Sequence, residues 1–501
     1  MLRVKHLRLE TLSEHVIVIH ERAVRDGNLG FNPLDRARVF GTDATTGQTH
    51  EITGVLNFCK DMLVAPDEIG VSEQAFRDLG LPEGAPVNAT LAVAPRSVDL
   101  VRDKLNGKRL AHADFNAILS DVARHRYSRV ELSMFVLACA LRKLDLEELV
   151  DYTRAMIATG TQLNFGAGPV ADKHCVGGVP GNRTTMITVP IIASFGIKVP
   201  KTSSRAITSP SGTADTMGML AQVALTPGRL REVVERAGAC IAWGGALDLA
   251  PADDILITVE RPMEIDTEAQ MVASILAKKK TVGATHVLID IPAGPTAKVR
   301  SLNAAERLAS LFRAVAEKID LHLNVEITEA RGPVGRGIGP RLEALDVLSV
   351  LKREPGAPGD LREKSLYLAA RLLEMTGAVA ANQGYRAAQE ALDSGAALER
   401  FERIVHEQGA VELPPEAPWR CTMEGQSDGR IREIDCWEMA RVAKRAGAPA
   451  NGAAGVWMLK TVGDVVRRGE PLFEIHAASE AQLGFARAYV EAHPHIFRYG
   501  F

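Results

Sequence analysis

The sequence predicts a multidomain α/β protein with a β-rich N-terminal domain, a helical domain, a central α/β domain with a mixed sheet, and a C-terminal α+β lobe. Three observations support this fold class. The chain has 501 residues, too many for one hydrophobic core, so several structural units are expected. Apolar residues change to a helical spacing near residue 100. Further along, buried apolar runs alternate with helical segments, which is typical of α/β domains.

Residues 1–97 form the predicted β-rich domain. Short apolar runs, such as HVIVIH at 15–20 and EITGVLNF at 51–58, lie between turn-rich segments. This pattern indicates strands joined by tight turns. The domain ends with a strand, short helix, turn and strand pattern that recurs in small β barrels.

Residues 98–165 form the predicted helical domain, which a later segment at about 251–281 completes. Apolar residues recur at i, i+3 and i+4, and Asp114 and Ser128 are candidate N-caps. The central α/β domain is expected over 166–250 and 282–405. A β-containing lobe is expected over 406–501, where apolar runs are separated by glycines.

Composition limits the possible partners and locations. The net charge is −3, with 46% hydrophobic and 24% charged residues, so no general affinity for nucleic acid or an anionic membrane is expected. The N-terminal segment lacks the apolar core of a signal peptide, and no run of about 18 apolar residues occurs. We therefore expect a cytoplasmic protein. The six cysteines have no paired spacing, so neither a disulfide framework nor a metal site is predicted.

A glycine-rich loop, DKHCVGGVPGNRTT at 172–185, is the first candidate for binding an anion. Gly177 and Gly178 let backbone N–H groups turn toward an anion, and Lys173 supplies a positive charge. A tight turn between a strand and a helix is the alternative. The loop lacks the glycine before Lys-Ser/Thr that a nucleotide-binding P-loop needs.

A cluster of hydroxyls, KTSSRAITSPSGTADT at 201–216, is the second candidate. The hydroxyls of Ser203, Thr208, Ser209 and Thr213 can donate hydrogen bonds to phosphate oxygens, and Arg205 offers a permanently charged guanidinium. A Ser/Thr-rich surface turn is the alternative.

The order of these two loops resembles the thymidine phosphorylase and AMP phosphorylase superfamily. The family pattern S-x-R followed by G-T-x-D is matched by Ser203 to Arg205 and Gly212 to Asp215. The family loop D-K-H-S-x-G-G is matched from Asp172 to Gly178, with Cys175 in place of serine. The resemblance covers about residue 100 to the end. It implies a homodimer or higher homo-oligomer that acts on small molecules without a cofactor, with inorganic phosphate as a substrate.

The resemblance also implies roles for individual residues. The proton donor would be Asp266 or His174. The phosphate site would comprise Lys173, Gly177, Gly178, Ser203 and Thr213. The sugar or 5′-phosphate site would comprise Ser204, Arg205, Ala206, Ile207, Thr208 and Ser209. The base would contact Ser274, Lys278, Asp253 and Lys298.

Part of this assignment has a structural alternative. Asp266 and Thr267 could be ordinary N-cap residues, with Thr267 and Gln270 forming a capping box. Lys278 to Lys280 could be a solvated run of charges at a helix end.

The implied reaction is phosphorolysis of an N-glycosidic bond, which yields a free base and a pentose 1-phosphate. Two departures from the thymidine phosphorylase pattern favour a nucleotide substrate of the AMP, CMP or UMP type, which would yield ribose 1,5-bisphosphate. Asp253 stands at or near the position of an arginine that holds the pyrimidine, and extra hydroxyls follow Arg205. Thymidine phosphorolysis is the alternative. A phosphoribosyltransferase, which would need an acidic magnesium site, and a nucleotide sensor are remoter alternatives.

Overall fold

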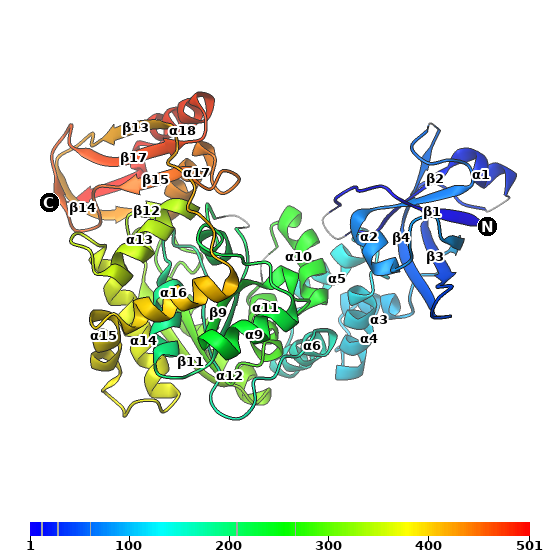
Figure 1. Cartoon of the computed structure of the whole chain (residues 1–501), viewed down its shortest axis with the longest axis horizontal. Coiled ribbons are helices and arrows are strands. Elements are labelled where there is room, and N and C mark those ends of the chain that lie inside the picture. The colour runs from blue at the N-terminus through cyan, green and yellow to red at the C-terminus, as the bar shows by residue number, and fades with distance from the viewer. Residues whose placement is uncertain (12–13, 28–29, 61, 207–208, 266, 501) are drawn as a thin grey trace. The chain divides into compact units, whose positions relative to one another are not determined.

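The computed structural model describes all residues except 12–13, 28–29, 61, 207–208, 266 and 501. Its contacts divide the chain into two compact units (Figure 1). The first contains residues 1–160 and 250–274, and the second contains 161–249 and 275–501. The expected multidomain α/β organisation is confirmed. The four predicted domain boundaries stay a prediction.

Six N-terminal strands close into a barrel in the order β1-β5-β2-β4-β3-β6. The strands are β1 (Leu2–His6), β2 (Val16–His20), β3 (Arg36–Thr42), β4 (Thr49–Cys59), β5 (Glu68–Val71) and β6 (Pro86–Leu91). Closure leaves none of these strands with an unpaired edge. Apolar side chains such as Ile17, Leu56 and Ile69 fill the interior. The short helices α1 (Glu21–Asp26) and α2 (Glu73–Leu79) follow β2 and β5.

Helices make up the rest of the first unit. They are α3 (Ser97–Leu105), α4 (His112–Ala123), α5 (Arg129–Leu141), α6 (Leu146–Thr159) and α10 (Pro251–Met263). Ser128 caps α5, as predicted, by accepting a hydrogen bond from the Glu131 amide. Asp114 is not the N-cap of α4. It lies inside the first turn, and its carboxylate accepts a hydrogen bond from the amide of Ala111. Helix α11 (Glu268–Thr281) runs from the first unit into the second.

Parallel strands form the centre of the second unit. Strand β10 (His286–Ala293) pairs in parallel with β7 (Ala171–Cys175) and β11 (His322–Glu329), and β8 (Val199–Ser203) pairs in parallel with β9 (Ala239–Trp243). A parallel bridge between Val170 and Lys198 joins the two groups. The prediction of a mixed sheet is therefore wrong for these described strands. Helices connect successive strands, and such crossovers return the chain in the same direction.

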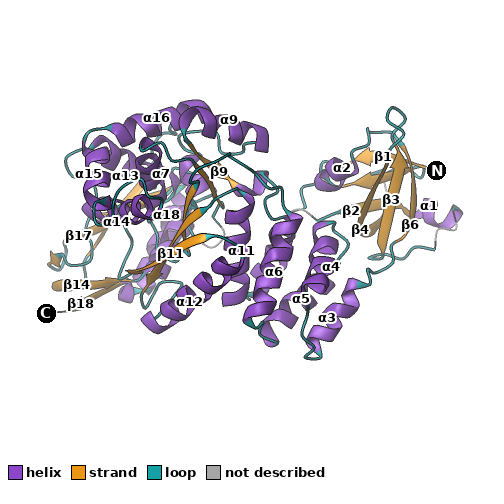
Figure 2. Cartoon of the chain, turned by 90° about the horizontal axis from the view of Figure 1, so that it is seen from below, coloured by secondary structure: helices purple, strands orange, loops and turns teal. Residues whose placement is uncertain are grey.

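Helices pack around the central strands (Figure 2). Among them, α9 (Pro227–Ala237) contacts β9 and α12 (Leu302–Lys318) contacts β11. Every residue of α7 (Thr184–Ser194) is buried except the last, as expected for a helix that is apolar all round. The remaining helices here are α8 (Thr213–Met217), α13 (Pro340–Lys352), α14 (Gly359–Met375), α15 (Gly384–Asp393) and α16 (Ala396–Gln408).

Two antiparallel sheets form the C-terminal part. One has the order β12-β15-β17-β13 and the other β16-β14-β18. Their strands are β12 (Gly337–Ile338), β13 (Trp419–Glu424), β14 (Gly429–Ile434), β15 (Gly455–Met458), β16 (Val465–Val466), β17 (Pro471–Ala477) and β18 (Phe497–Gly500). Helices α17 (Cys436–Ala446) and α18 (Glu480–Ala492) share a core with both sheets. Across the described part of the chain, no helix combines the length and apolar character needed to cross a membrane.

Candidate active site

The two predicted anion-binding loops follow neighbouring parallel strands of the second unit. The first begins on β7, which carries Lys173, and the second begins on β8, whose last residue is Ser203. The carboxyl ends of parallel strands meet at one edge of a sheet, where α/β proteins commonly bind ligands. The fold therefore brings the two loops to the same edge.

Lys173 is a buried cation with fixed partners. Its side chain is 1% exposed, and its Nζ donates a hydrogen bond to Thr184 Oγ1 at 2.7 Å. Asp290 Oδ2 lies 3.9 Å from the same nitrogen. Burial lowers the pKa of Lys173, and the negative charge of Asp290 opposes that shift. The lysine is thus held in one position beside a single carboxylate.

Asp290 is shared between two lysines. Lys364 Nζ lies 3.2 Å from Asp290 Oδ2, and Thr328 donates a hydrogen bond to Oδ1 at 2.7 Å. Burial acts to raise the pKa of Asp290, but Lys364, Lys173 and Thr328 outweigh it, so the pKa lies below its ordinary value. An ionised carboxylate here offsets part of the charge of two buried lysines.

Arg183 ties the second loop to the first. Its Nη1 donates to Thr213 Oγ1 at 3.1 Å and its Nη2 donates to the Ser211 carbonyl at 2.8 Å, while Nε is paired with Glu343. The next residue, Thr184, is the hydrogen-bond acceptor for Lys173. Arg183 and Thr184, at the start of α7, therefore link Thr213 with Lys173. The family resemblance assigned both Thr213 and Lys173 to the phosphate site.

Asp215 holds the hydroxyl-rich loop in shape. Its Oδ2 accepts hydrogen bonds from the amides of Ala206 at 2.6 Å and Gly212 at 2.9 Å. The motif aspartate therefore fixes both ends of the segment that follows Arg205. The guanidinium of Arg205 lies over the ring of Trp243, 4.7 Å from its centroid, a cation–π geometry.

Two hydroxyls of this loop donate hydrogen bonds to the loop's own backbone. Ser209 donates to the Ser211 carbonyl at 3.0 Å, and Ser203 donates to the Ser204 carbonyl at 3.3 Å. Ile207 and Thr208, also assigned to the sugar or 5′-phosphate site, lie outside the described residues.

Two glycines of the first loop adopt a backbone conformation that residues with a side chain rarely adopt. Gly177 and Gly178 have φ angles of 95° and 87°. A Cβ placed on Gly178 would lie 2.2 Å from the backbone nitrogen of Lys298, whereas a Cβ on Gly177 would meet nothing within 4 Å. The loop and the backbone at Lys298 are therefore adjacent because position 178 carries no side chain.

His174 lies next to Lys173 on β7. Burial lowers the pKa of His174 well below its ordinary value, and the nearby charges of Lys279, Lys201 and Lys173 add to this shift. The imidazole is therefore neutral near pH 7.

A buried ion-pair group surrounds Asp172. Lys279 Nζ donates to Asp172 Oδ2 at 2.7 Å, and Lys201 Nζ lies 3.6 Å from Oδ1. Burial lowers the pKa of Lys201 to about 7, although Asp172 opposes that shift. The interpretation of residues 278–280 as a solvated run is wrong for Lys279, which is 2% exposed. Its charge fastens the end of α11 to β7.

The residues assigned to the base fall in both compact units. In the first unit, Ser274 donates to Asp253 Oδ2 at 2.8 Å, and Asp253 is fully buried. In the second unit, Lys278 lies on α11 and Lys298 is exposed. Thr267 Oγ1 accepts a hydrogen bond from the Gln270 amide at 3.1 Å, which is one half of the predicted capping box, and the Gln270 side chain instead accepts a hydrogen bond from Tyr152. Asp266, the candidate proton donor, lies outside the described residues.

Sequence reasoning missed four charged residues around the phosphate candidates: Lys201, Asp290, Glu343 and Lys364. Asp290 carried a detectable signal, since an acidic residue inside the apolar run HVLIDIP has to find a buried partner. Lys364 lies among ordinary helical residues of α14 and gave no such signal.

Comparisons with known proteins match most of the chain. The helical bundle domain of a glycosyl transferase family matches residues 98–160, and the a/b domain of that family matches residues 167–398. The C-terminal domain of pyrimidine nucleoside phosphorylases matches residues 430–496. The first two matches indicate a glycosyl transferase, and together with the third match they support a pentosyltransferase.

Nearly full-length relatives identify the family within this class. A "Putative thymidine phosphorylase" of Methylococcus capsulatus is 46% identical over 97% of this chain and 94% of its own length. A "Putative thymidine phosphorylase 2" of Acidovorax sp. is 48% identical over 93% and 91%. The chain belongs to the thymidine phosphorylase-like family.

Solved structures support the fold alone. Anthranilate phosphoribosyltransferase from Thermus thermophilus has a TM-score of 0.52 and 19% identity, and the match covers 62% of this chain and 99% of that one. At this identity the match shows a shared fold and carries no conclusion about activity.

Proposed function

We propose that this protein is a thymidine phosphorylase, which cleaves thymidine with inorganic phosphate to give thymine and 2-deoxyribose 1-phosphate. The names of the relatives and the pyrimidine nucleoside phosphorylase domain support this substrate class. The observation that carries the proposal is the buried cation Lys173, joined through Thr184 and Arg183 to Thr213. A fixed cation among hydroxyl groups suits an oxyanion such as phosphate.

In this reaction a phosphate oxygen attacks the anomeric carbon of the sugar. The bond from that carbon to the base nitrogen breaks, its electron pair goes to the base, and a proton neutralises the departing base. We assign Lys173, Ser203, Thr213 and the backbone at Gly177 and Gly178 to holding the phosphate. Positioning the nucleophile in this way removes much of the entropic cost of a reaction between two molecules.

The proton donor is proposed to be His174 or Asp266. To give a proton to the base, His174 has to be protonated first, and a bound phosphate dianion would favour this by raising its pKa against the effects of burial and the nearby lysines. The pH dependence of kcat/KM in His174→Gln tests this role. If His174 is the donor, the limb of the profile that reports its titration disappears in the variant.

A nucleoside 5′-monophosphate is the second candidate substrate. Asp253 favours it: this residue is buried and accepts a hydrogen bond from Ser274, where the family resemblance expects an arginine near the pyrimidine. Arg205, held over Trp243, would be the cation that meets the 5′-phosphate.

A substrate panel separates the two candidates. Purified protein is given thymidine, uridine, AMP, CMP or UMP, with and without inorganic phosphate, and the released base is quantified. Faster phosphate-dependent cleavage of thymidine supports the main proposal. Faster cleavage of a monophosphate contradicts the main proposal and supports a nucleoside 5′-monophosphate as the substrate. Base release that does not depend on phosphate excludes both.

A further inference from the structure

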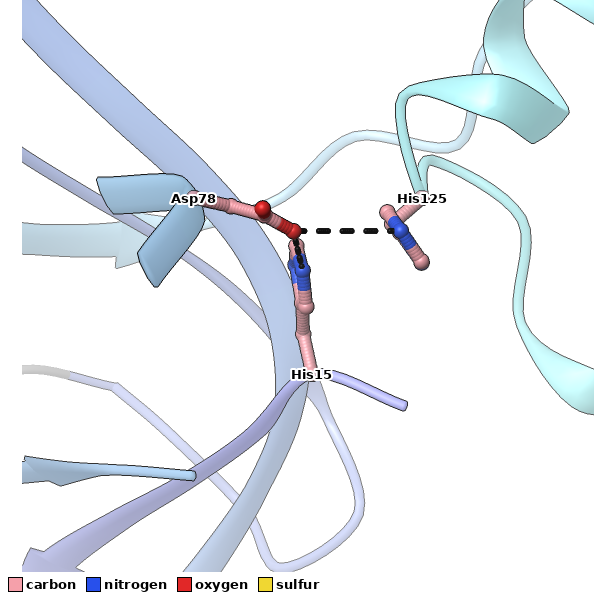
Figure 3. A group of neighbouring side chains, drawn as sticks. All are labelled: His15, Asp78 and His125. Carbon is pink, nitrogen blue, oxygen red and sulfur yellow. Dashed lines mark hydrogen bonds and ion pairs between the residues drawn. The ribbon is translucent and has the colours of Figure 1, made fainter. Parts of the chain in front are cut away.

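The first compact unit contains a group of side chains that the proposed reaction does not use: His15, Asp78 and His125 (Figure 3). Asp78 Oδ2 lies 2.7 Å from His15 Nε2 and 4.0 Å from His125 Nε2. One ligand-capable atom from each residue falls within a span of 4.8 Å. No other His, Cys, Asp and Glu group of three or more meets this spacing among the described residues.

The hydrogen bonds of His15 leave one ring nitrogen directed at the carboxylate. Its Nδ1 lies 3.0 Å from the carbonyl oxygen of Thr53 on β4. A carbonyl can only accept, so Nδ1 carries a proton. Nε2 then faces an acidic oxygen across a distance that a proton bridges, and a metal ion bonded to both atoms requires this distance to widen. Histidines that bind metals commonly donate their other N–H to a backbone carbonyl in this way.

His125 extends the group beyond a simple hydrogen-bonded pair. A hydrogen bond accounts for the 2.7 Å contact of His15 with Asp78, but His125 Nε2 at 4.0 Å is outside hydrogen-bonding distance. This residue has a φ of 54°, and its carbonyl accepts a hydrogen bond from Arg36 at 2.5 Å.

We propose that His15, Asp78 and His125 bind a divalent transition metal ion of the Zn²⁺ type. Two imidazoles and one carboxylate form a ligand set that suits zinc, which takes four ligands in tetrahedral geometry. The group lies beside a pocket lined by residues that include Thr53, Tyr127 and Thr258, from which water can supply the fourth ligand.

Such a site would fasten the barrel to the helical bundle within the first unit. His15 precedes β2 and Asp78 lies on α2, both in the barrel, while His125 follows α4 of the bundle. The contacts that join the same parts include the ion pair of Arg129 with Glu14 at 2.9 Å. The role we assign to the metal is therefore structural.

Binding requires a local rearrangement. The rings of His15 and His125 are stacked, with centroids 4.1 Å apart and planes at 27°, so one ring has to turn before both lone pairs meet at one point. The metal also displaces the proton between His15 and Asp78. Arg36 and Arg129 line the pocket with Glu14, so the release of this proton limits the accumulation of positive charge.

Calorimetric titration of the chelator-treated full-length protein with Zn²⁺ tests the proposal. We expect one ion per chain, release of about one proton measured in buffers of different ionisation enthalpy, and affinity that rises with pH. We also expect a higher thermal unfolding midpoint with Zn²⁺ present. Failure of the wild-type chain to bind Zn²⁺ overturns the proposal and identifies the group as a proton-bridged pair.

Variants locate the ion. His125→Gln and Asp78→Asn should weaken binding at least about tenfold, because each removes a ligand. The matched control is His6→Gln, since His6 Nε2 lies 2.7 Å from Glu73 and its ring stacks on Phe76. Among the described residues this pair has no third ligand. His286→Gln removes a stacked histidine pair in the second unit. Equal affinity in the Asp78 variant, or loss of binding in either control, contradicts the assignment.

Discussion

At the scale of single residues, the candidate phosphate site depends on keeping a buried lysine charged. Removal of Lys173 from water favours its neutral form, and the largest opposing effect comes from Asp290. The same carboxylate also lies near Lys364. The charge of Lys173 is therefore set by residues that need not touch the substrate.

We predict that Asp290→Asn changes the pH at which Lys173 loses its proton. Loss of the carboxylate lowers the pKa of Lys173 further, so the lysine loses its proton at a lower pH. We expect the alkaline limb of the kcat/KM profile for phosphate to move down by on the order of one pH unit. Steady-state rates between pH 6 and about 10 measure this shift.

The controls separate this effect from misfolding. Lys173→Ala should lose activity at every pH while keeping its circular dichroism spectrum. Glu329→Gln removes an exposed carboxylate at the end of β11, where it pairs with Arg331, and should leave the profile unchanged. An unshifted profile in a folded Asp290 variant would show that Asp290 does not control the charge of Lys173.

At the scale of elements, the glycine-rich loop connects the end of β7 to α7 by a backbone that only glycine adopts readily. Both Gly177 and Gly178 have positive φ, and the same strain of about 1–2 kcal/mol is expected when either becomes alanine. Only at position 178 does the new Cβ meet the backbone of Lys298. The pair therefore separates backbone strain from a steric clash.

We predict that Gly178→Ala destabilises the protein more than Gly177→Ala by about 1–3 kcal/mol, the usual cost of overpacking. Gly178→Ala should also raise KM for phosphate more, because the loop has to move away from Lys298. Urea unfolding and phosphate saturation curves measure these effects. Equal losses of unfolding free energy in the two variants would show that the close approach at position 178 does not affect stability.

At the scale of the whole molecule, stability should depend on a buried carboxyl in α13. Burial raises the pKa of Asp346 to about 7, although the amides of Gly337 and Arg336 oppose this shift by donating hydrogen bonds at 2.7 Å each. The folded state therefore binds a proton more tightly than the unfolded chain does. The resulting stability is complete below the unfolded pKa of 3.8 and is lost as the pH rises toward 7.

We predict that Asp346→Asn removes this pH dependence. Between pH 5 and pH 8 the wild type should lose on the order of 2 kcal/mol more unfolding free energy than the variant. Urea titrations of both proteins at the two pH values measure the difference. Parallel changes in the two proteins would show that Asp346 is already ionised at pH 5.

The sequence by itself determined the class of fold and the two loops of the candidate site. Local signals sufficed for these features: alternating and helical apolar spacing, a cap at Ser128, and glycines beside Lys173. The mixed sheet was predicted wrongly because short apolar runs do not reveal strand direction. Direction follows from the helices that connect the strands.

Only the tertiary structure decided which charged groups are buried together. Asp172 and Lys279 are 107 positions apart, yet they form an ion pair. In the sequence, Lys279 has the same surroundings as its neighbour Lys280, which is bonded to an exposed carbonyl. The physical reason is that the energy of a buried charge depends on which distant residues surround it after folding, and local sequence patterns do not contain that information.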